Sequence, residues 1–182
     1  NTGGTMVEKC CHFFDLMHLI VNADPVRIYC SGAMDVNHLD ERYDGKVPDI
    51  IDNSYTIVDF DNGTRAMLDL CMFAEASKNE QEISVVGTQG KVEAMVTEGV
   101  VRIGRRTDGL GAFSERHITD PTIRHAGLHH GASYLEHEAF ALAITDGGKP
   151  AVTLDDGLMS VAVGVAAHRS IELGRAVTLE EV

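Results

Sequence analysis

Apolar side chains recur at helical spacing near the start of the chain. They are three or four residues apart, at Val7, Cys10, Phe13, Phe14, Met17 and Ile20. Such spacing places them on one face of a helix. Thr5 and Glu8 have the capping-box arrangement that starts a helix, and Asp24-Pro25 ends the pattern. The pattern predicts a helix over residues 6–21.

The middle of the chain changes to the pattern of β-strands. Short runs rich in β-branched residues alternate with turn residues, at 26–34, 53–60, 64–73, 82–86, 91–96 and 100–104. Asp61-Asn62-Gly63 and the GTQG sequence at 87–90 are typical of tight turns between paired strands. Neighbouring strands are therefore predicted to pair antiparallel.

Helical patterns return after two polar segments, 35–51 and 105–128, which we interpret as loops. Ser133 and Glu136 form another capping-box pattern, and Gly147-Gly148 follows that helix. A last helix is predicted from near Asp155 to Gly174, and we expect it to bury Leu158, Val161, Val165 and Leu173.

The order of these elements predicts an α+β fold. A helix, a block of strands and further helices are typical of a single, mainly antiparallel open sheet with helices on one face. The chain has 182 residues, 44% of them hydrophobic, so we expect one domain spanning residues 1–182.

Charge and hydropathy limit the classes of partner. The formal net charge of −13 repels a phosphate backbone, so we expect no binding to nucleic acid. No apolar run is long enough to cross a bilayer and no signal peptide is evident, so we expect a cytoplasmic protein without membrane contact.

The first predicted helix carries the most informative polar residues. Glu8, His12 and Asp15 follow at spacings of four and three, which puts them on one stripe of an apolar helix. An imidazole beside a carboxylate can exchange a hydroxyl proton near neutral pH, as oxidation of an alcohol requires. A structural interpretation stays open, because Glu8 is also a cap and a buried histidine usually has a structural role.

Weaker candidates lie in the loops. His129 and His130 precede the second capped helix, near His125, and could reach the same pocket as His12 or be solvated loop residues. A metal site joining them to Glu8 would lack a compact motif such as H-E-x-x-H, so we expect no metal. The 35–51 loop is a candidate specificity loop through three polar side chains: His38, Arg42 and Tyr43.

Residues 3–16, GGTMVEKCCHFFDL, contain a glycine pair, an acidic residue, a histidine four residues later and an aspartate three further on. This pattern resembles the start of the C-terminal domain of the Gfo/Idh/MocA oxidoreductases, relatives of glucose-fructose oxidoreductase and inositol dehydrogenase. Residues 83–92 are similar to the family's strand-turn-strand unit, and residues 140–150 and 156–179 to its closing helices. The resemblance covers nearly the whole chain.

The resemblance implies roles for single residues. His12 matches the histidine that exchanges a proton with the reacting hydroxyl, and Glu8 matches an aspartate that holds substrate or orients that histidine. Glutamate departs from the family pattern, and its extra methylene moves the carboxylate by about 1.5 Å. Asp15 matches a position that we take as mainly structural, and we place it with His129 and His130 among the candidate substrate-binding residues.

The resemblance also implies the context of the domain. An N-terminal nucleotide-binding Rossmann domain, which supplies a lysine and binds NAD or NADP, is expected outside this chain, since no G-x-G-x-x-G fingerprint is present. The expected activity of the whole protein is a dehydrogenase acting on a sugar, cyclitol or related polyol, with the fragment inactive alone. A homodimer or tetramer through the sheet is expected.

Two other functions stay open. An NAD-dependent glycosidase of the same fold would release a sugar without net reduction of the cofactor. A non-catalytic ligand-binding or assembly module would have kept the fold and lost the chemistry.

Overall fold

The computed structural model describes residues 3–182 as two compact units. One comprises Asn1–Glu75 with Val152–Val182 and the other Ala76–Ala151, and each is described by itself. The α+β class is confirmed, and every strand pairing is antiparallel. The expectation of a single sheet was wrong, because the strands form two four-stranded sheets. Residues 72–80 form turns and bends rather than a hairpin.

The first unit contains a sheet in the order β3-β2-β1-β8. Its strands are β1 (Pro25–Ala33), β2 (Asn53–Phe60), β3 (Arg65–Cys71) and β8 (Val177–Thr178). Alternate residues of β2 are buried, as the period of a half-buried strand requires. The turn between β2 and β3 is confirmed, and Gly63 has the positive φ of +82° that favours glycine there. The short strand β8 was not predicted.

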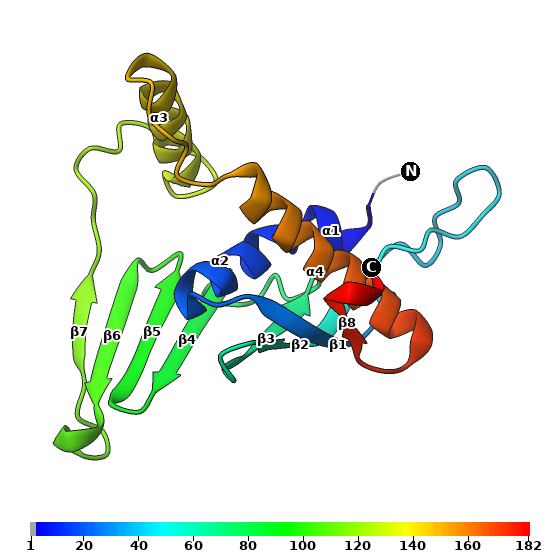
Figure 1. The fold of residues 1–182 in the computed structure, drawn as a ribbon, viewed down its shortest axis with the longest axis horizontal. Coiled ribbons are helices and arrows are strands. Elements are labelled where there is room, and N and C mark those ends of the chain that lie inside the picture. Colours follow the sequence, from blue (N-terminus) through cyan, green and yellow to red (C-terminus); the bar gives the residue numbers. More distant parts are fainter. Residues whose placement is uncertain (1–2) are drawn as a thin grey trace. The chain divides into compact units, whose positions relative to one another are not determined.

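Three helices belong to this unit: α1 (Thr5–Glu8), α2 (Cys11–Val21) and α4 (Leu154–Leu173). They lie on one face of the sheet (Figure 1). The core between helices and sheet includes Met6, Cys10, Phe14, Ile28, Val58, Val163 and Val177. This layer of apolar side chains is what holds the unit together.

The predicted helix over residues 6–21 is interrupted at Lys9 and Cys10. The Cys10 N–H donates to the Thr5 carbonyl, five residues back, which widens the turn before α2 begins. The predicted capping box was also wrong. The Thr5 hydroxyl is buried and donates instead to the carbonyl oxygen of Ile51, at 2.7 Å, because tertiary packing brings that carbonyl close.

The buried face of α4 is not the one that the sequence pattern predicted. The four residues that were expected to be buried, Leu158, Val161, Val165 and Leu173, are all exposed. The buried residues are Val163 and five smaller ones, Ser160, Gly164, Ala166, Ala167 and Ser170. Gly164 explains why this face of α4 is buried. The helix comes so close to α1 that a Cβ at position 164 would lie 2.6 Å from the carbonyl oxygen of Met6. The small face lets α1 and α4 pack backbone to backbone.

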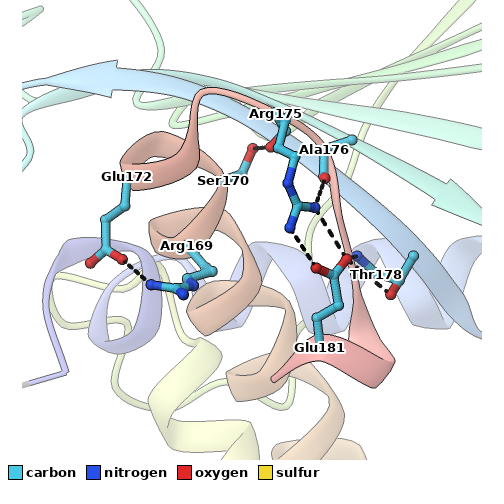
Figure 2. Close-up of polar contacts among 7 residues, drawn as sticks. All are labelled: Arg169, Ser170, Glu172, Arg175, Ala176, Thr178 and Glu181. Atoms are coloured by element: carbon cyan, nitrogen blue, oxygen red, sulfur yellow. Dashed lines mark hydrogen bonds and ion pairs between the residues drawn. The ribbon is translucent and has the colours of Figure 1, made fainter.

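Hydrogen bonds close both ends of α4. Thr153 and Asp156 form a complete capping box, which the sequence analysis missed. At the other end Gly174 has a left-handed conformation, as predicted. In Figure 2 the Arg175 guanidinium faces the Glu181 carboxylate. The two groups are 2.7 Å apart. Hydrogen bonding by Arg175, then by the Thr178 N–H, lowers the pKa of Glu181 to about 2. The pair ties the C-terminal turn η2 (Leu179–Glu181) to the end of α4.

The second unit contains a sheet in the order β4-β5-β6-β7. Its elements are β4 (Gln81–Gly87), β5 (Gly90–Val96), β6 (Val100–Arg105), η1 (Arg106–Asp108), β7 (Ser114–His117) and α3 (Ala132–Thr145). Strand β7 lies within the segment interpreted as a loop. The predicted cap of α3 was wrong, because Gly131 precedes the helix and the Ser133 hydroxyl bonds to His129. No residue of α3 is buried.

The glycines of α4 test the packing of α1 on α4. Gly164→Ala should lower the free energy of unfolding by about 2 kcal/mol, because the added methyl group meets backbone rather than a movable side chain. Gly157→Ala is the matched control in the same helix, with no atom within 4 Å of the new Cβ. It should be neutral or stabilising by up to about 1 kcal/mol. Urea denaturation measures both, and equal effects would contradict the packing described.

Candidate functional site

The residues that resemble a catalytic pair lie on the solvent side of α1 and α2. Met6, Cys10 and Phe14 form the buried stripe of this segment, at intervals of four residues. Glu8 and His12 fall midway between them and are both exposed. The widened turn at Cys10 therefore does not carry either side chain into the core. The side chains of Glu8 and His12 therefore lie on the side of the segment that faces away from the sheet of the first unit.

The glycine pair and Glu8 form the start of this segment. The Gly3 N–H donates to Oε1 of Glu8 at 2.9 Å, so the carboxylate does cap the first turn, but at a different residue from the predicted Thr5. Gly4 has φ +79°, and a Cβ there would lie 2.7 Å from Nε2 of His168. Both the conformation and the close ring of His168 require glycine at position 4. Oε2 of Glu8 has no hydrogen bond within residues 3–182, so half of the carboxylate is open to a ligand.

The side chain of His12 has no polar partner among the described residues. Within the described part of the chain its imidazole has neither a hydrogen bond nor an ion pair. By contrast, His18 on the same helix lies 3.4 Å from the carboxylate of Asp24. Neither of the two hollows described among residues 3–182 is lined by Glu8 or His12.

The candidate substrate-binding residues are divided between the units. Asp15 lies in the first unit, half-buried on α2. His129 and His130 lie in the second, where Nδ1 of His129 contacts the Ser133 hydroxyl at 3.0 Å and Nε2 of His130 lies 3.5 Å from Glu80. Both histidines are exposed. The structure brings Glu8, His12 and Asp15 together on one helical segment, and His129 and His130 together before α3.

His168 on α4 was missed by the sequence analysis. Its Nε2 is buried without a hydrogen bond in the described residues, and burial lowers the pKa of its ring. The ring packs on Gly4, where the segment bearing Glu8 and His12 begins. A histidine among small helical residues has no motif, and only the fold shows that it supports this turn.

The 35–51 segment is largely irregular, as predicted, and Asp52 holds its base. The buried Asp52 carboxylate accepts the backbone N–H groups of Asp35, Val36 and Asn37, at 2.7–3.0 Å. Burial alone would raise the pKa of Asp52, but these bonds and one from the Asn53 amide together lower it well below its ordinary value. The negative charge of Asp52 thus fixes the backbone at the start of the 35–51 loop.

Side chains within the loop form a small network. The Tyr43 hydroxyl donates to Oε2 of Glu41 at 2.8 Å, and Nδ1 of His38 lies 2.8 Å from Oε1. Arg42 donates to the carbonyl of Leu39. Each of the three polar side chains of the candidate specificity loop, His38, Arg42 and Tyr43, therefore has a partner within the loop.

Residues 3–182 contain no group of three or more His, Cys, Asp or Glu side chains able to hold a metal ion. Among these same residues, no helix combines the length and apolar character needed to cross a bilayer.

Comparison with known proteins assigns the fold to a family. The sequence pattern described as "Oxidoreductase family, C-terminal alpha/beta domain" matches residues 1–179. The chain belongs to the Gfo/Idh/MocA oxidoreductase family. Levoglucosan dehydrogenase in complex with NADH and levoglucosan superposes on this Gfo/Idh/MocA domain with a TM-score of 0.78 at 18% identity, over 98% of the chain and 51% of that protein. An oxidoreductase domain protein from Kribbella flavida gives 0.76 at 18% identity, over 97% and 51%.

Two curated relatives match along the whole Gfo/Idh/MocA domain. Myo-inositol 2-dehydrogenase of Thermotoga maritima is 30% identical over 100% of the chain and 51% of that protein. scyllo-Inositol 2-dehydrogenase (NAD(+)) of Bacillus subtilis is 24% identical over 99% of the chain and 49% of that protein. The chain thus spans about half the length of the curated relatives it matches.

A substitution of Asp52 tests whether its hydrogen bonds hold the base of the 35–51 loop. Asp52→Asn should lower the free energy of unfolding by about 3 kcal/mol at neutral pH, because a buried acceptor of three N–H groups loses its charge. The pKa of Asp52 is lower in the folded state, so its contribution is complete above the ordinary value of 3.8 and is lost as the pH falls below it. The variant should therefore show a flatter dependence of stability on pH in acid.

Asp40→Asn is the control for this test. Asp40 is exposed in the same loop, so the same chemical change should leave stability and its pH dependence nearly unchanged. Unfolding in urea at about pH 7 and at about pH 2, well below the ordinary pKa of an aspartate, measures both variants. If Asp52→Asn were as mild as Asp40→Asn, the hydrogen bonds would not be what fixes the loop.

Proposed function

We propose that this chain is the substrate-binding domain of an NAD(P)-dependent dehydrogenase that oxidises a hydroxyl of a cyclitol, sugar or related polyol. The observation that carries the proposal is the exposed pair Glu8 and His12, held on a segment whose opposite stripe is buried. The family and the names of the two inositol dehydrogenases support the same reaction.

The chemistry needs one proton acceptor beside the reacting carbon. As the C–H bond breaks, its hydrogen and electron pair leave as a hydride, the O–H bond gives its proton to the His12 imidazole, and the carbon becomes a carbonyl. An imidazole without an internal partner is able to accept that proton. The open Oε2 of Glu8 can accept a hydrogen bond from a neighbouring hydroxyl and orient the polyol.

A nicotinamide cofactor supplies the hydride acceptor when it is bound. This chain contains no G-x-G-x-x-G sequence, and we infer that a nucleotide-binding domain elsewhere in the protein holds NAD or NADP. His12 faces away from its own core, which fits a site completed by another domain. We infer that the chain alone has no activity.

We assign substrate binding to Asp15, His129 and His130 in the whole protein. Their side chains offer the donors and acceptors that several hydroxyl groups would need. His129 and His130 have weak, exposed contacts that a ligand could replace at low cost.

We also infer a homodimer or tetramer formed through the open face of the first sheet. Tyr29, Ile57 and Met67 lie side by side across β1, β2 and β3, and all are exposed on the face away from the helices. In the next row, Asp59 is held between Arg27 and Arg65, at 2.6 and 3.6 Å. An apolar row beside a paired charge suits a surface shared by two copies.

The assignment of His12 is tested in the full-length enzyme. His12→Ala should lower kcat by about 10²- to 10⁴-fold, since general base catalysis is lost. His18→Ala is the control. It removes an imidazole from the same helix, but one that already contacts the Asp24 carboxylate. Turnover is followed by NADH absorbance with the best polyol from a panel of inositols and hexoses.

Further measurements make the outcome specific. NADH binding to the variant should be unchanged, and the fall of kcat/KM at low pH should disappear with the imidazole. Unchanged turnover by His12→Ala would refute the catalytic role. Release of a sugar without accumulation of NADH would identify a glycosidase, and loss of all nucleotide binding by the unaltered protein would identify a non-catalytic module.

The oligomer is tested by a charge in the apolar row. Ile57→Asp should shift the full-length protein toward monomer at about 10 µM, because a carboxylate would have to be buried without a partner. Val47→Asp places the same change on an exposed residue of the 35–51 loop and should leave the mass unchanged. Light scattering gives the mass, and a monomeric unaltered protein would contradict the inference.

A further inference from the structure

A hollow in the second unit gathers positive charge in an acidic chain. The hollow has a volume of about 550 Å³, within the range of small-molecule sites. Lys91, Arg102, Arg105 and Arg106 line it, against a single lining carboxylate, Glu93. The chain as a whole carries −13. Such a local reversal of charge raises the concentration of anions at this surface.

Ion pairs neutralise only part of this charge. Nζ of Lys91 lies 2.6 Å from Glu93, and Nε of Arg102 lies 2.8 Å from Glu115. Counting both carboxylates, two positive charges remain, and they belong to Arg105 and Arg106. Within the described residues, neither guanidinium has an ion pair or a hydrogen bond. Arg105 and Arg106 are neighbours in sequence, and a guanidinium group without a bound carboxylate presents the planar donors that bind phosphate or carboxylate groups.

Glycines shape the hollow. A Cβ at Gly90 would lie 2.2 Å from the carbonyl oxygen of Gly104, so the floor between β5 and β6 excludes side chains there. Gly109 and Gly111 have φ of +86° and +80°, which turn the chain after η1. The turn places Leu110 and Phe113 on the wall of the hollow, exposed by 109% and 60%. Two exposed apolar side chains thus line the same hollow as the arginines.

We propose that this hollow binds a small dianion or polyanion of the phosphate ester class, with its charged groups on Arg105 and Arg106 and its apolar portion on Phe113. Residues of the second unit alone build this site, and none of them belongs to the proposed polyol site. Occupancy would therefore be separable from turnover, and its failure would leave the dehydrogenase proposal unaffected.

Titration of ¹⁵N-labelled protein at low ionic strength tests the proposal, with inorganic phosphate, pyrophosphate and phenyl phosphate as probes. Pyrophosphate should cause saturable shifts of the amide signals of residues 104–113, and phenyl phosphate should bind several-fold more tightly than phosphate. Arg105→Gln with Arg106→Gln should weaken pyrophosphate binding by about tenfold or more, since two charge-assisted contacts are lost. A parallel titration with citrate, a tricarboxylate, shows whether the hollow prefers phosphate or carboxylate groups. Stronger binding of citrate than of pyrophosphate would overturn the assignment to phosphate esters.

Matched variants separate the site from general charge. Arg116→Gln with Arg124→Gln removes the same charge from the same unit outside the hollow, and should leave pyrophosphate affinity within about twofold. Phe113→Ala should abolish the preference for phenyl phosphate, whereas Phe140→Ala, similarly exposed on α3, should not.

Equal losses in the two double variants would overturn the proposal, as would the absence of saturable shifts in the unaltered protein. A change of oligomeric state on Arg105→Gln with Arg106→Gln, without any pyrophosphate binding, would show that the hollow is a subunit contact instead.

Discussion

Close packing of α4 on α1 is the contact on which the first unit depends. Gly164 lets the backbone at Met6 come against α4, and buried alanines and serines keep the rest of that helix close to the sheet. Met6, Phe14 and Ile28 then fill the remaining volume between the layers. Larger residues at the contact would hold the helices apart and open cavities, which cost stability in proportion to their size.

This contact also decides where the candidate catalytic groups lie. Because Met6, Cys10 and Phe14 occupy the core side, Glu8 and His12 are left on the outside of the same segment. The half-buried ring of His168 and the capping of Gly3 by Glu8 fix the start of the segment. A rigid support with reactive groups on its open side is what a site completed by another domain requires.

The second unit has a different physical character. Its helix α3 buries no residue, and its sheet carries a hollow lined by arginines and exposed apolar side chains. Such surfaces are typical of segments that meet a ligand or another protein surface rather than a core of their own.

The sequence by itself determined the elements whose signals are local: the strands at 26–34 and 53–60, the turn at Gly63, the end of α4 at Gly174, and the motif that places Glu8 and His12 one turn apart. Local sequence patterns predict these features because each depends on residues that are neighbours along the chain. Only the tertiary structure decided that α4 buries its small face, that the first helix widens at Cys10, that Thr5 bonds to Ile51 and that the strands divide into two sheets. Those outcomes depend on the fit of side-chain volumes and hydrogen-bonding groups between segments far apart in sequence, which no local pattern records.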